Sequence, residues 1–304
     1  MFDRMSVKLA PITTPPLSPG VWAIVLLLEK YSSMRLVSFD LFRTLGCPGI
    51  HYVKPGHLLK QRCLIEAADL VLFPDYADIN QLCFVWGKSI FPSLPSYLLG
   101  FNKVEMTLAF QNCCPVNVPL TLILPNTPVY QSQALDEMPL PFVAKLPRST
   151  RGEGVFLIET AADWRAYCDR TDMLYVQEQL IIDRDLRVIW IGDGVVHAYW
   201  RVGAAGEFHN NVAHGGAIEV NNIPSAAVEL VTAVARRLHI DYAGFDVAMV
   251  NGHPFLFEFN RLFGTEGLNR AGINPGPIIH SFLERRYSTG ERRLNTEDPE
   301  TDLQ

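Results

Sequence analysis

The fold is decided by one stretch of sequence: Gly244-Phe-Asp-Val-Ala-Met-Val250, then Asn251-Gly252-His253, then Pro254-Phe-Leu-Phe-Glu-Phe-Asn260. Both flanks are strand-like, and Asn-Gly is a strong hairpin turn signal. Asp246, Glu258 and Asn260 place three oxygen-bearing side chains in this apolar hairpin. A carboxylate there costs free energy unless something compensates it. The pattern indicates ligands for a hard cation such as Mg²⁺; an ordinary hairpin with one buried acid is the alternative.

The register of this hairpin decides whether the three side chains meet. Side chains alternate faces along a strand, so Glu258 and Asn260 share a face. Asp246 joins them only if the turn holds an odd number of residues, as in Asn251–His253, which places Asp246 opposite Glu258. A two-residue Asn-Gly turn would place Phe257 opposite Asp246 instead, because a slip of one residue turns every side chain to the other face.

The composition is that of a soluble globular protein. The 304 residues are 48% hydrophobic and 19% charged, with a net charge of −6, and they suffice for two or three subdomains. No charge excess marks a general nucleic-acid binder. The six cysteines lack C-x-x-C spacing and are expected to be reduced, buried residues of a cytoplasmic protein, a catalytic thiol being the alternative. The longest apolar run, Val21–Leu28, is too short to span a bilayer, so no membrane partner is expected.

The first part of the chain predicts a parallel α/β layer, because strands alternate with helices there. The strand candidates are Leu36–Phe39, Asp69–Phe73 and Lys88–Phe91, with a helix at Gly56–Ala68. Residues 1–33 are expected to be an N-terminal extension, disordered or not native. One hypothesis is that translation starts at Met34, which N-terminal sequencing of the native protein would test.

The rest of the chain is richer in strands. A helix is expected from Asn102-Lys103 to Gln111, and a loop rich in Pro, Asn and Ser up to about residue 137. Further strand candidates are Thr121–Leu124, Phe142–Lys145, Met173–Leu180, Leu186–Ile191 and Val195–Arg201. Further helix candidates are Ala161–Cys168, a segment opening at Pro224-Ser225, and Pro275–Arg286. The predicted parts are 34–101, 102–181 and 182–287, followed by a disordered tail at 288–304.

Lys145 leaves a strand before a turn that contains Gly152 and Gly154. An ammonium group beside a glycine-rich turn suits a polyphosphate, because glycines let backbone N–H groups approach oxygens closely. A plain hairpin loop fits the same pattern and is favoured on this segment alone. Further along, Gln177, Glu178 and Gln179 end a strand whose edge could bind an adenine ring; a merely polar strand end fits equally.

Asp185, Arg187 and Arg201 flank the turn Gly192-Asp193-Gly194. If that turn holds three residues, Asp185 pairs with Arg201 and Arg187 with Tyr199, and the charged side chains share a face. Guanidinium forks suit carboxylate and phosphate groups, and a surface ion pair is the alternative.

Another polar stretch, His209-Asn210-Asn211, precedes Gly215-Gly216. Asn211 can donate to a phosphate or a carboxylate, and the glycine pair permits close backbone approach. A polar loop with no ligand fits about equally well.

Taken in order, these segments resemble the ATP-grasp superfamily, and most closely its RimK-like carboxylate–amine ligases, over residues 35–287. The resemblance implies an α/β (α+β) fold with an N-terminal domain, a central lid and a C-terminal mixed-sheet subdomain, with ATP between the last two. It implies that Lys103 and Lys145 hold phosphates. By the same analogy, the adenine ring would contact Gln177, Glu178 and Gln179. The rest of the nucleotide would contact Asp185, Arg187, His209, Asn210 and Asn211. Two Mg²⁺ (or Mn²⁺) ions would be bound by Asp246, Glu258 and Asn260.

The reaction implied is formation of an amide through an acyl phosphate, with Arg201 and Arg187 as catalytic residues. The partners would be a small-molecule or peptide carboxylate and an amine such as an amino acid. Related folds are often homo-oligomers, and the sequence leaves the oligomeric state open. A phosphotransferase and a non-catalytic ATP-binding protein are the alternatives. The sequence departs from the family at Arg148 and Arg151, in a loop with few glycines, and at His209, where an arginine is expected. Residues 35–100 resemble the family's N-terminal domain only loosely, and because that domain helps to choose the substrate, the substrate stays open.

Overall fold

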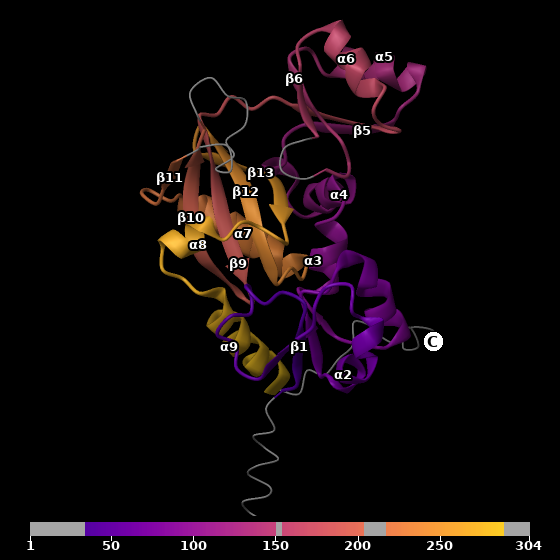
Figure 1. Cartoon of the computed structure of the whole chain (residues 1–304). Coiled ribbons are helices and arrows are strands. Elements are labelled where there is room, and N and C mark those ends of the chain that lie inside the picture. Colours follow the sequence, from indigo (N-terminus) through magenta and orange to yellow (C-terminus); the bar gives the residue numbers. More distant parts are fainter. Residues whose placement is uncertain (1–33, 150–153, 204–216, 289–304) are drawn as a thin grey trace, which may run out of the picture. The chain divides into compact units, whose positions relative to one another are not determined.

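The computed structural model describes residues 34–149, 154–203 and 217–288. By its contacts the chain divides into Met1–Met34 and Arg35–Gln304, and the second unit carries everything described below. Its described strands form one parallel and two antiparallel sheets (Figure 1). The mixed α/β architecture agrees with the expected fold class.

The N-terminal sheet is parallel, with its strands in the order β2-β1-β3-β4. Its elements are β1 (Leu36–Ser38), β2 (Ile50–Tyr52), η1 (Leu59–Gln61), α2 (Arg62–Ala67), β3 (Leu70–Leu72), η2 (Tyr76–Asp78), η3 (Gln81–Val85), β4 (Ile90–Phe91) and α3 (Leu94–Leu99). The three predicted strands are confirmed. The helix predicted from Gly56 begins only at Leu59, because Gly56 adopts a φ of +78° in a turn, which a right-handed helix does not tolerate.

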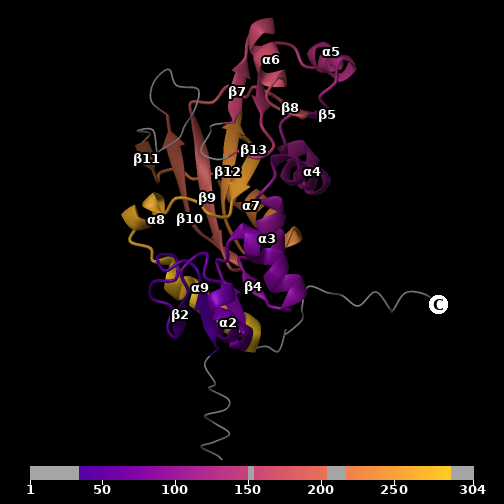
Figure 2. The same cartoon turned by 45° about the vertical axis from the view of Figure 1, so that its right-hand side comes forward.

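The central sheet is antiparallel, with its strands in the order β5-β8-β6-β7. Its elements are β5 (Thr121–Pro125), α5 (Pro128–Glu137), β6 (Phe142–Lys145), β7 (Val155–Ile158), α6 (Ala161–Cys168) and β8 (Met173–Glu178). Helices α5 and α6 pack on this sheet (Figure 2) through a core that includes Ala134, Trp164 and Val176.

Two predictions for this region had opposite outcomes. Helix α6 has the predicted bounds, and Thr160 and Asp163 cap its first turn reciprocally. The loop predicted up to residue 137 is wrong, because α5 occupies Pro128–Glu137. Pro128 lies in the first turn of that helix, where the missing N–H has no intrahelical partner to lose.

The C-terminal sheet is antiparallel, with its strands in the order β11-β10-β9-β12-β13. Its strands and helices are α4 (Lys103–Cys113), η4 (Pro115–Asn117), β9 (Arg184–Ile191), β10 (Gly194–Val202), β11 (Ala217–Glu219), α7 (Ser225–Arg237), β12 (Tyr242–Val250), β13 (His253–Asn260), α8 (Glu266–Arg270) and α9 (Pro275–Ser288). Helices α4 and α7 share a core with one face of the sheet. Because Leu186 and Phe245 belong to that core, their neighbours Arg187 and Asp246 point to the opposite face.

The β12–β13 hairpin has the predicted pairing but not the predicted turn. Val250 pairs with His253, so the turn is the two-residue Asn251-Gly252, with φ values of +51° and +80°. The register then shifts between Asp246 and Val247. This β-bulge leaves Phe257 without a partner and restores Asp246 opposite Glu258.

The β9–β10 hairpin repeats this arrangement. Gly194 pairs with Ile191, and the register shifts between Val195 and His197. The turn is therefore Gly192-Asp193, and not the three-residue turn that the pairing of Asp185 with Arg201 was expected to require. Because the bulge adds one residue to β10, Arg201 still lies opposite Asp185, and Tyr199 opposite Arg187, as predicted.

A buried carboxylate joins the N-terminal sheet to β12. Asp241 precedes β12 and accepts hydrogen bonds from the backbone N–H of Ser93 at 2.7 Å and from the Ser96 hydroxyl at 3.3 Å. Arg286 of α9 lies 3.6 Å from its other oxygen. Burial raises the pKa of Asp241 to about 6 from an ordinary 3.8, against the opposing effect of these donors.

We expect Asp241 to make stability depend on pH. Because its pKa is higher in the folded protein, its favourable contribution is complete below about pH 4 and is lost as the pH rises through 6. A shift from 3.8 to about 6 corresponds to about 3 kcal/mol. Asp241→Asn keeps an acceptor and cannot ionise, so urea unfolding from pH 4 to 7 should show a flatter dependence than the parent protein. Equal slopes for Asp241→Asn and the exposed control Asp136→Asn would contradict this expectation.

The six cysteines, all described, are unpaired as predicted, but only Cys114 and Cys168 are buried and Cys63 is exposed. None of the helices in the described ranges is long and apolar enough to cross a membrane.

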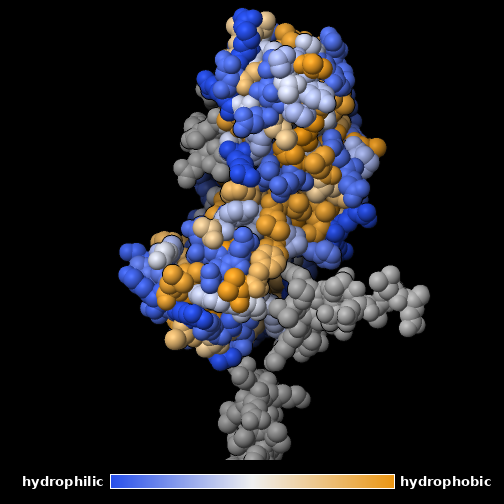
Figure 3. Space-filling view, turned by 90° about the vertical axis from the view of Figure 1, so that its right-hand side faces the viewer, coloured by the Kyte–Doolittle hydropathy of each residue, from blue (hydrophilic) through white to orange (hydrophobic). Residues whose placement is uncertain are grey.

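Hydrophobic side chains gather on the face seen in Figure 3. Exposed apolar residues of α4 and the following segment include Leu108, Val116 and Leu120. Contiguous patches of this kind are typical of contact surfaces, which is compatible with a homo-oligomer and leaves the oligomeric state open.

Candidate functional site

A buried ion-pair cluster lies on the face of the C-terminal sheet opposite the core shared with α4 and α7, which we call the open face. Arg187 donates from Nε and Nη2 to the two oxygens of Asp246, at 2.5 and 3.1 Å. Arg201 Nη2 lies 3.1 Å from Asp246 Oδ2, and Arg201 Nε donates to Asp185 at 2.8 Å. Each of these four side chains is at most 12% exposed. The alternative of a surface ion pair is therefore wrong.

Burial has a large effect on both carboxylates of this cluster. It disfavours ionisation of Asp246, but Arg187 and Arg201 outweigh it and lower the pKa of that carboxyl. Burial also raises the pKa of Asp185, with Arg201 opposing the rise. Asp246 is thus held as an anion between two cations. Asp185, predicted to contact the nucleotide, has both oxygens engaged by Arg201.

Gly244 gives Arg187 the room to lie across β12. A Cβ at this position would lie 2.9 Å from Arg187 Cδ and 2.9 Å from Phe263 Cβ. Such contacts are shorter than van der Waals separation. A side chain here would move the guanidinium that holds Asp246.

Glu258 and Asn260 lie beside this cluster at the end of β13. The Asn260 amide donates to Glu258 Oε1 at 3.1 Å, so the two share a face as predicted. The other oxygen of Glu258 lies 3.8 Å from Lys103 Nζ, and the Glu258 side chain is 27% exposed. The structure therefore brings the three predicted metal ligands to the same end of the sheet, with Glu258 on the accessible side.

Two lysines approach Glu258 from other elements. Lys103 opens α4, and its Nζ donates to the carbonyl oxygen of Ser149 at 2.7 Å. Lys145 ends β6 with its Nζ 5.6 Å from the ring centre of Tyr175 and 5.4 Å from that of Phe257. Burial lowers the pKa of Lys145 to about 8, while Glu258 acts to raise it. The lysine predictions are thus brought together with the carboxylates.

The loop after Lys145 connects the paired strands β6 and β7, so it is a hairpin loop. Gly154 closes it by accepting from the Leu146 N–H at 2.8 Å. A Cβ on Gly154 would lie 2.3 Å from the Ser149 hydroxyl, so only glycine lets the loop return this closely. Gly152 and Arg151 lie outside the described residues.

The predicted adenine edge is used differently by its three residues. The Gln177 amide donates to Thr121 at 2.8 Å, inside the sheet. The Glu178 carboxylate accepts from the Leu120 N–H at 2.6 Å. Gln179 follows the strand and is half-buried. The first two side chains therefore stabilise the strand end, and their contact with a nucleotide stays a prediction.

The other predicted ligands His209, Asn210 and Asn211 fall outside the described residues, as do Gly215 and Gly216. Sequence reasoning missed Ser149 and Phe257, which contact Lys103 and Lys145. Ser149 carried a weak signal, as a hydroxyl residue in the loop. Phe257 carried none, because its position depends on the bulge.

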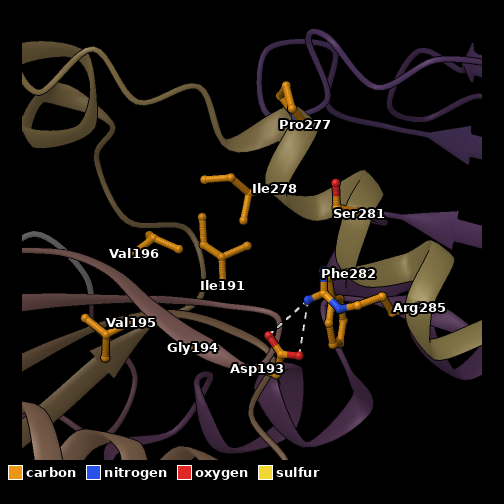
Figure 4. A pocket seen from close by; sticks show the side chains of 10 residues that line it. All are labelled: Ile191, Asp193, Gly194, Val195, Val196, Pro277, Ile278, Ser281, Phe282 and Arg285. Atoms are coloured by element: carbon orange, nitrogen blue, oxygen red, sulfur yellow. Dashed lines mark hydrogen bonds and ion pairs between the residues drawn. The ribbon is translucent and has the colours of Figure 1, made fainter.

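One cavity of about 370 Å³ lies between the β9–β10 hairpin and α9 (Figure 4). Its walls include Ile191, Val195, Ile278 and Phe282, and Arg285 bonds Asp193 at its edge. Every predicted catalytic, cofactor and metal residue is absent from its lining. The chemistry is therefore assigned to the polar cluster on the open sheet face.

The three sheets together have the fold of solved ATP-grasp proteins. The fold matches a RimK domain ATP-grasp protein from Sphaerobacter thermophilus (TM-score 0.63, 15% identity, 82% of this chain and 98% of the other). It also matches Bacillus anthracis D-alanine–D-alanine ligase complexed with ATP (TM-score 0.64, 15% identity, 84% and 99%).

The chain belongs to the RimK-like ATP-grasp family, whose model matches residues 104–280. The ribosomal protein bS6–L-glutamate ligase of Shigella boydii serotype 4 is 32% identical over 189 residues, which are 60% of this chain and 62% of that protein. The chain thus spans about three fifths of the length of such curated relatives.

Proposed function

We propose that the protein is an ATP- and Mg²⁺-dependent ligase that joins a carboxylate to an amine. The observation that carries the proposal is the convergence of Lys103 and Lys145 on the Asp246–Glu258–Asn260 end of the C-terminal sheet. Anionic phosphates and the cations between them need this mixture of positive side chains and oxygen ligands. The relatives named as glutamate ligases support an amino acid such as glutamate as the amine.

The donor set fits magnesium. Asp246 Oδ1 accepts one hydrogen bond from the described residues, so a second lone pair is available for a metal. Among the described residues, Glu258 Oε2 has only the longer contact of 3.8 Å with Lys103. The described residues contain no group of three His, Cys, Asp or Glu side chains placed to hold a metal ion. The predicted site is not such a group, because its third ligand is the amide of Asn260. Bound Mg²⁺ would neutralise the phosphate charge.

The side chains then have separable tasks. Lys103 and Lys145 hold the phosphates, and the β6–β7 loop between them limits access of water. A substrate carboxylate oxygen attacks the γ-phosphorus, the bond to the bridging oxygen breaks, and ADP leaves. Among the described residues, Nη1 of Arg187 and Nη1 of Arg201 lack a hydrogen-bond acceptor, so each offers donors to the phosphoryl oxygens.

The second half of the reaction forms the new bond. The amine nitrogen attacks the acyl carbon, phosphate leaves with the bonding electron pair, and the nitrogen loses a proton to solvent. Little covalent participation by the protein is needed, because alignment and charge neutralisation supply the rate enhancement. This chemistry requires both a carboxylate and an amine.

The test is release of ADP and phosphate from Mg-ATP, with carboxylates such as glutamate-terminated peptides offered with and without amino acids. Release that needs both partners, with a product heavier by the amine less water, supports the ligase. A stable phosphorylated product formed without an amine would indicate a phosphotransferase. ATP binding without turnover under every pair would indicate a non-catalytic protein.

We expect ATP affinity to fall as Lys145 loses its proton. Its pKa is about 8, so the ammonium is present below pH 8 and lost above it. At pH 9 about nine-tenths of the group is neutral, so binding of a non-hydrolysable ATP analogue should be weaker by up to about tenfold than at pH 7. Lys145→Arg stays charged, and calorimetry should show a flatter dependence. An equal slope in both proteins would assign the effect to another group.

A further inference from the structure

Arg261 directly follows the predicted metal ligand Asn260, where β13 ends. It is half-buried, and its guanidinium carbon lies 4.4 Å from the ring centre of Tyr97. The hydroxyl of Tyr97 donates to the Pro74 carbonyl at 2.8 Å. Within the described part of the chain, Arg261 forms neither an ion pair nor a hydrogen bond.

The other arginines near this point have anionic partners. Arg187 and Arg201 bind Asp246, and Arg43 binds Asp40 at 2.5 Å and the Phe263 carbonyl at 3.1 Å. A partly desolvated cation without a counter-ion costs free energy until an anion pairs with it.

An aromatic surface borders Arg261 on the side of the N-terminal sheet. Tyr76, just after β3, stacks on Phe101 with ring centres 3.7 Å apart. Arg148, which follows the strand of Lys145, lies over the other partner of this stack at 5.4 Å from the Phe101 ring centre. The carboxyl ends of parallel strands are common ligand sites, and Tyr76 lies in the segment that follows the carboxyl end of β3.

We propose that Arg261 binds a substrate carboxylate that is not phosphorylated, and so selects substrates with an additional carboxylate. The inference rests on the proposed function, because it places a substrate beside Asn260. The carboxylate belongs either to the acyl substrate or to the incoming amino acid. Both sources offer the same planar anion, which a guanidinium binds through paired hydrogen bonds.

The test measures equilibrium binding in the presence of Mg²⁺ and a non-hydrolysable ATP analogue, so it does not need turnover. One arm compares a peptide ending in glutamate with the same peptide ending in glutamine; the other compares free glutamate with free glutamine. Arg261→Gln should weaken binding of the acidic probe in one arm by about 30-fold, the loss expected for a charged hydrogen bond. The glutamine probes and the ATP analogue should change less than about threefold, within the spread of neutral surface changes.

Further variants separate binding from structure. Arg261→Lys keeps the charge and should recover part of the acidic preference. Arg270→Gln removes a guanidinium from an exposed ion pair with Glu266 and should leave all affinities unchanged. Equal losses for acidic and amide probes, or parent protein that does not prefer the acidic probe in either arm, would overturn the assignment. Absence of ADP release with every substrate would reject the ligase, whereas these binding results concern Arg261 alone.

Discussion

Glu258→Gln is expected to lower ATP-dependent turnover by about 10²- to 10³-fold, the range seen when one group that stabilises a charged transition state is removed. The Glu258 carboxylate contacts Asn260 and Lys103, and 27% of its side chain is exposed. Glutamine keeps the shape and an acceptor, but it removes the negative charge that a Mg²⁺ ligand supplies. The fold should survive, because the hydrophobic core does not include this side chain.

The measurement is the initial rate of ADP release at saturating ATP and substrates, with the melting temperature recorded for each variant. Glu219→Gln provides a matched control, since Glu219 forms an exposed ion pair with Arg184 on the edge strand β11. That control should retain parental turnover. Near-normal turnover of Glu258→Gln would remove Glu258 from the proposed metal site.

Asp246→Asn is expected to destabilise the protein by about 3–5 kcal/mol, the usual cost of removing one partner from a buried ion pair. Arg187 and Arg201 both approach this carboxylate, and Asp246 is 7% exposed. Asparagine would leave the guanidinium groups of Arg187 and Arg201 close together without the negative charge that compensates both of them. The free energy of unfolding in urea, at unchanged denaturant dependence, measures this loss.

An exposed ion pair provides the comparison for Asp246→Asn. Glu66 pairs with Arg62 one helical turn away, at 2.8 Å, with both side chains at least 40% exposed. Glu66→Gln should cost less than about 1 kcal/mol, because solvent screens such pairs. Similar losses for both variants would mean that Asp246 is not held as a buried anion by its two arginines.

Alternation of apolar and polar residues was enough to predict the cross-strand neighbours at the site. Asp185 lies opposite Arg201 and Asp246 opposite Glu258, as expected from one face buried against the α4–α7 core. When one face of a sheet must be apolar, alternation of apolar and polar residues fixes which residues of each strand lie on the other face. The burial of these pairs under apolar neighbours was harder to predict, which left open the alternative of a surface ion pair.

This register was expected to require turns with an odd number of residues, and that expectation is wrong. Both hairpins use two-residue turns, and a bulge at Phe257 or near Val196 corrects the register. The residues of each bulge carry no sequence signal for it, because the bulge is fixed by the pairing of side chains further along the two strands. Its consequence for function is direct, since bulged Phe257 contacts the Lys145 ammonium.

The sequence by itself determined most of the strands, the helix α6, and which polar residues belong to the open face, because hydrophobic periodicity is a local property. The short strands β2 and β11 were not predicted. Tertiary structure alone decided which charges are compensated. Lys145 is buried, and the Glu178 carboxylate accepts a hydrogen bond at the end of its strand. Arg261 has no carboxylate partner among the described residues. Desolvation and pairing depend on atoms brought from distant parts of the chain, and a linear pattern does not contain those distances.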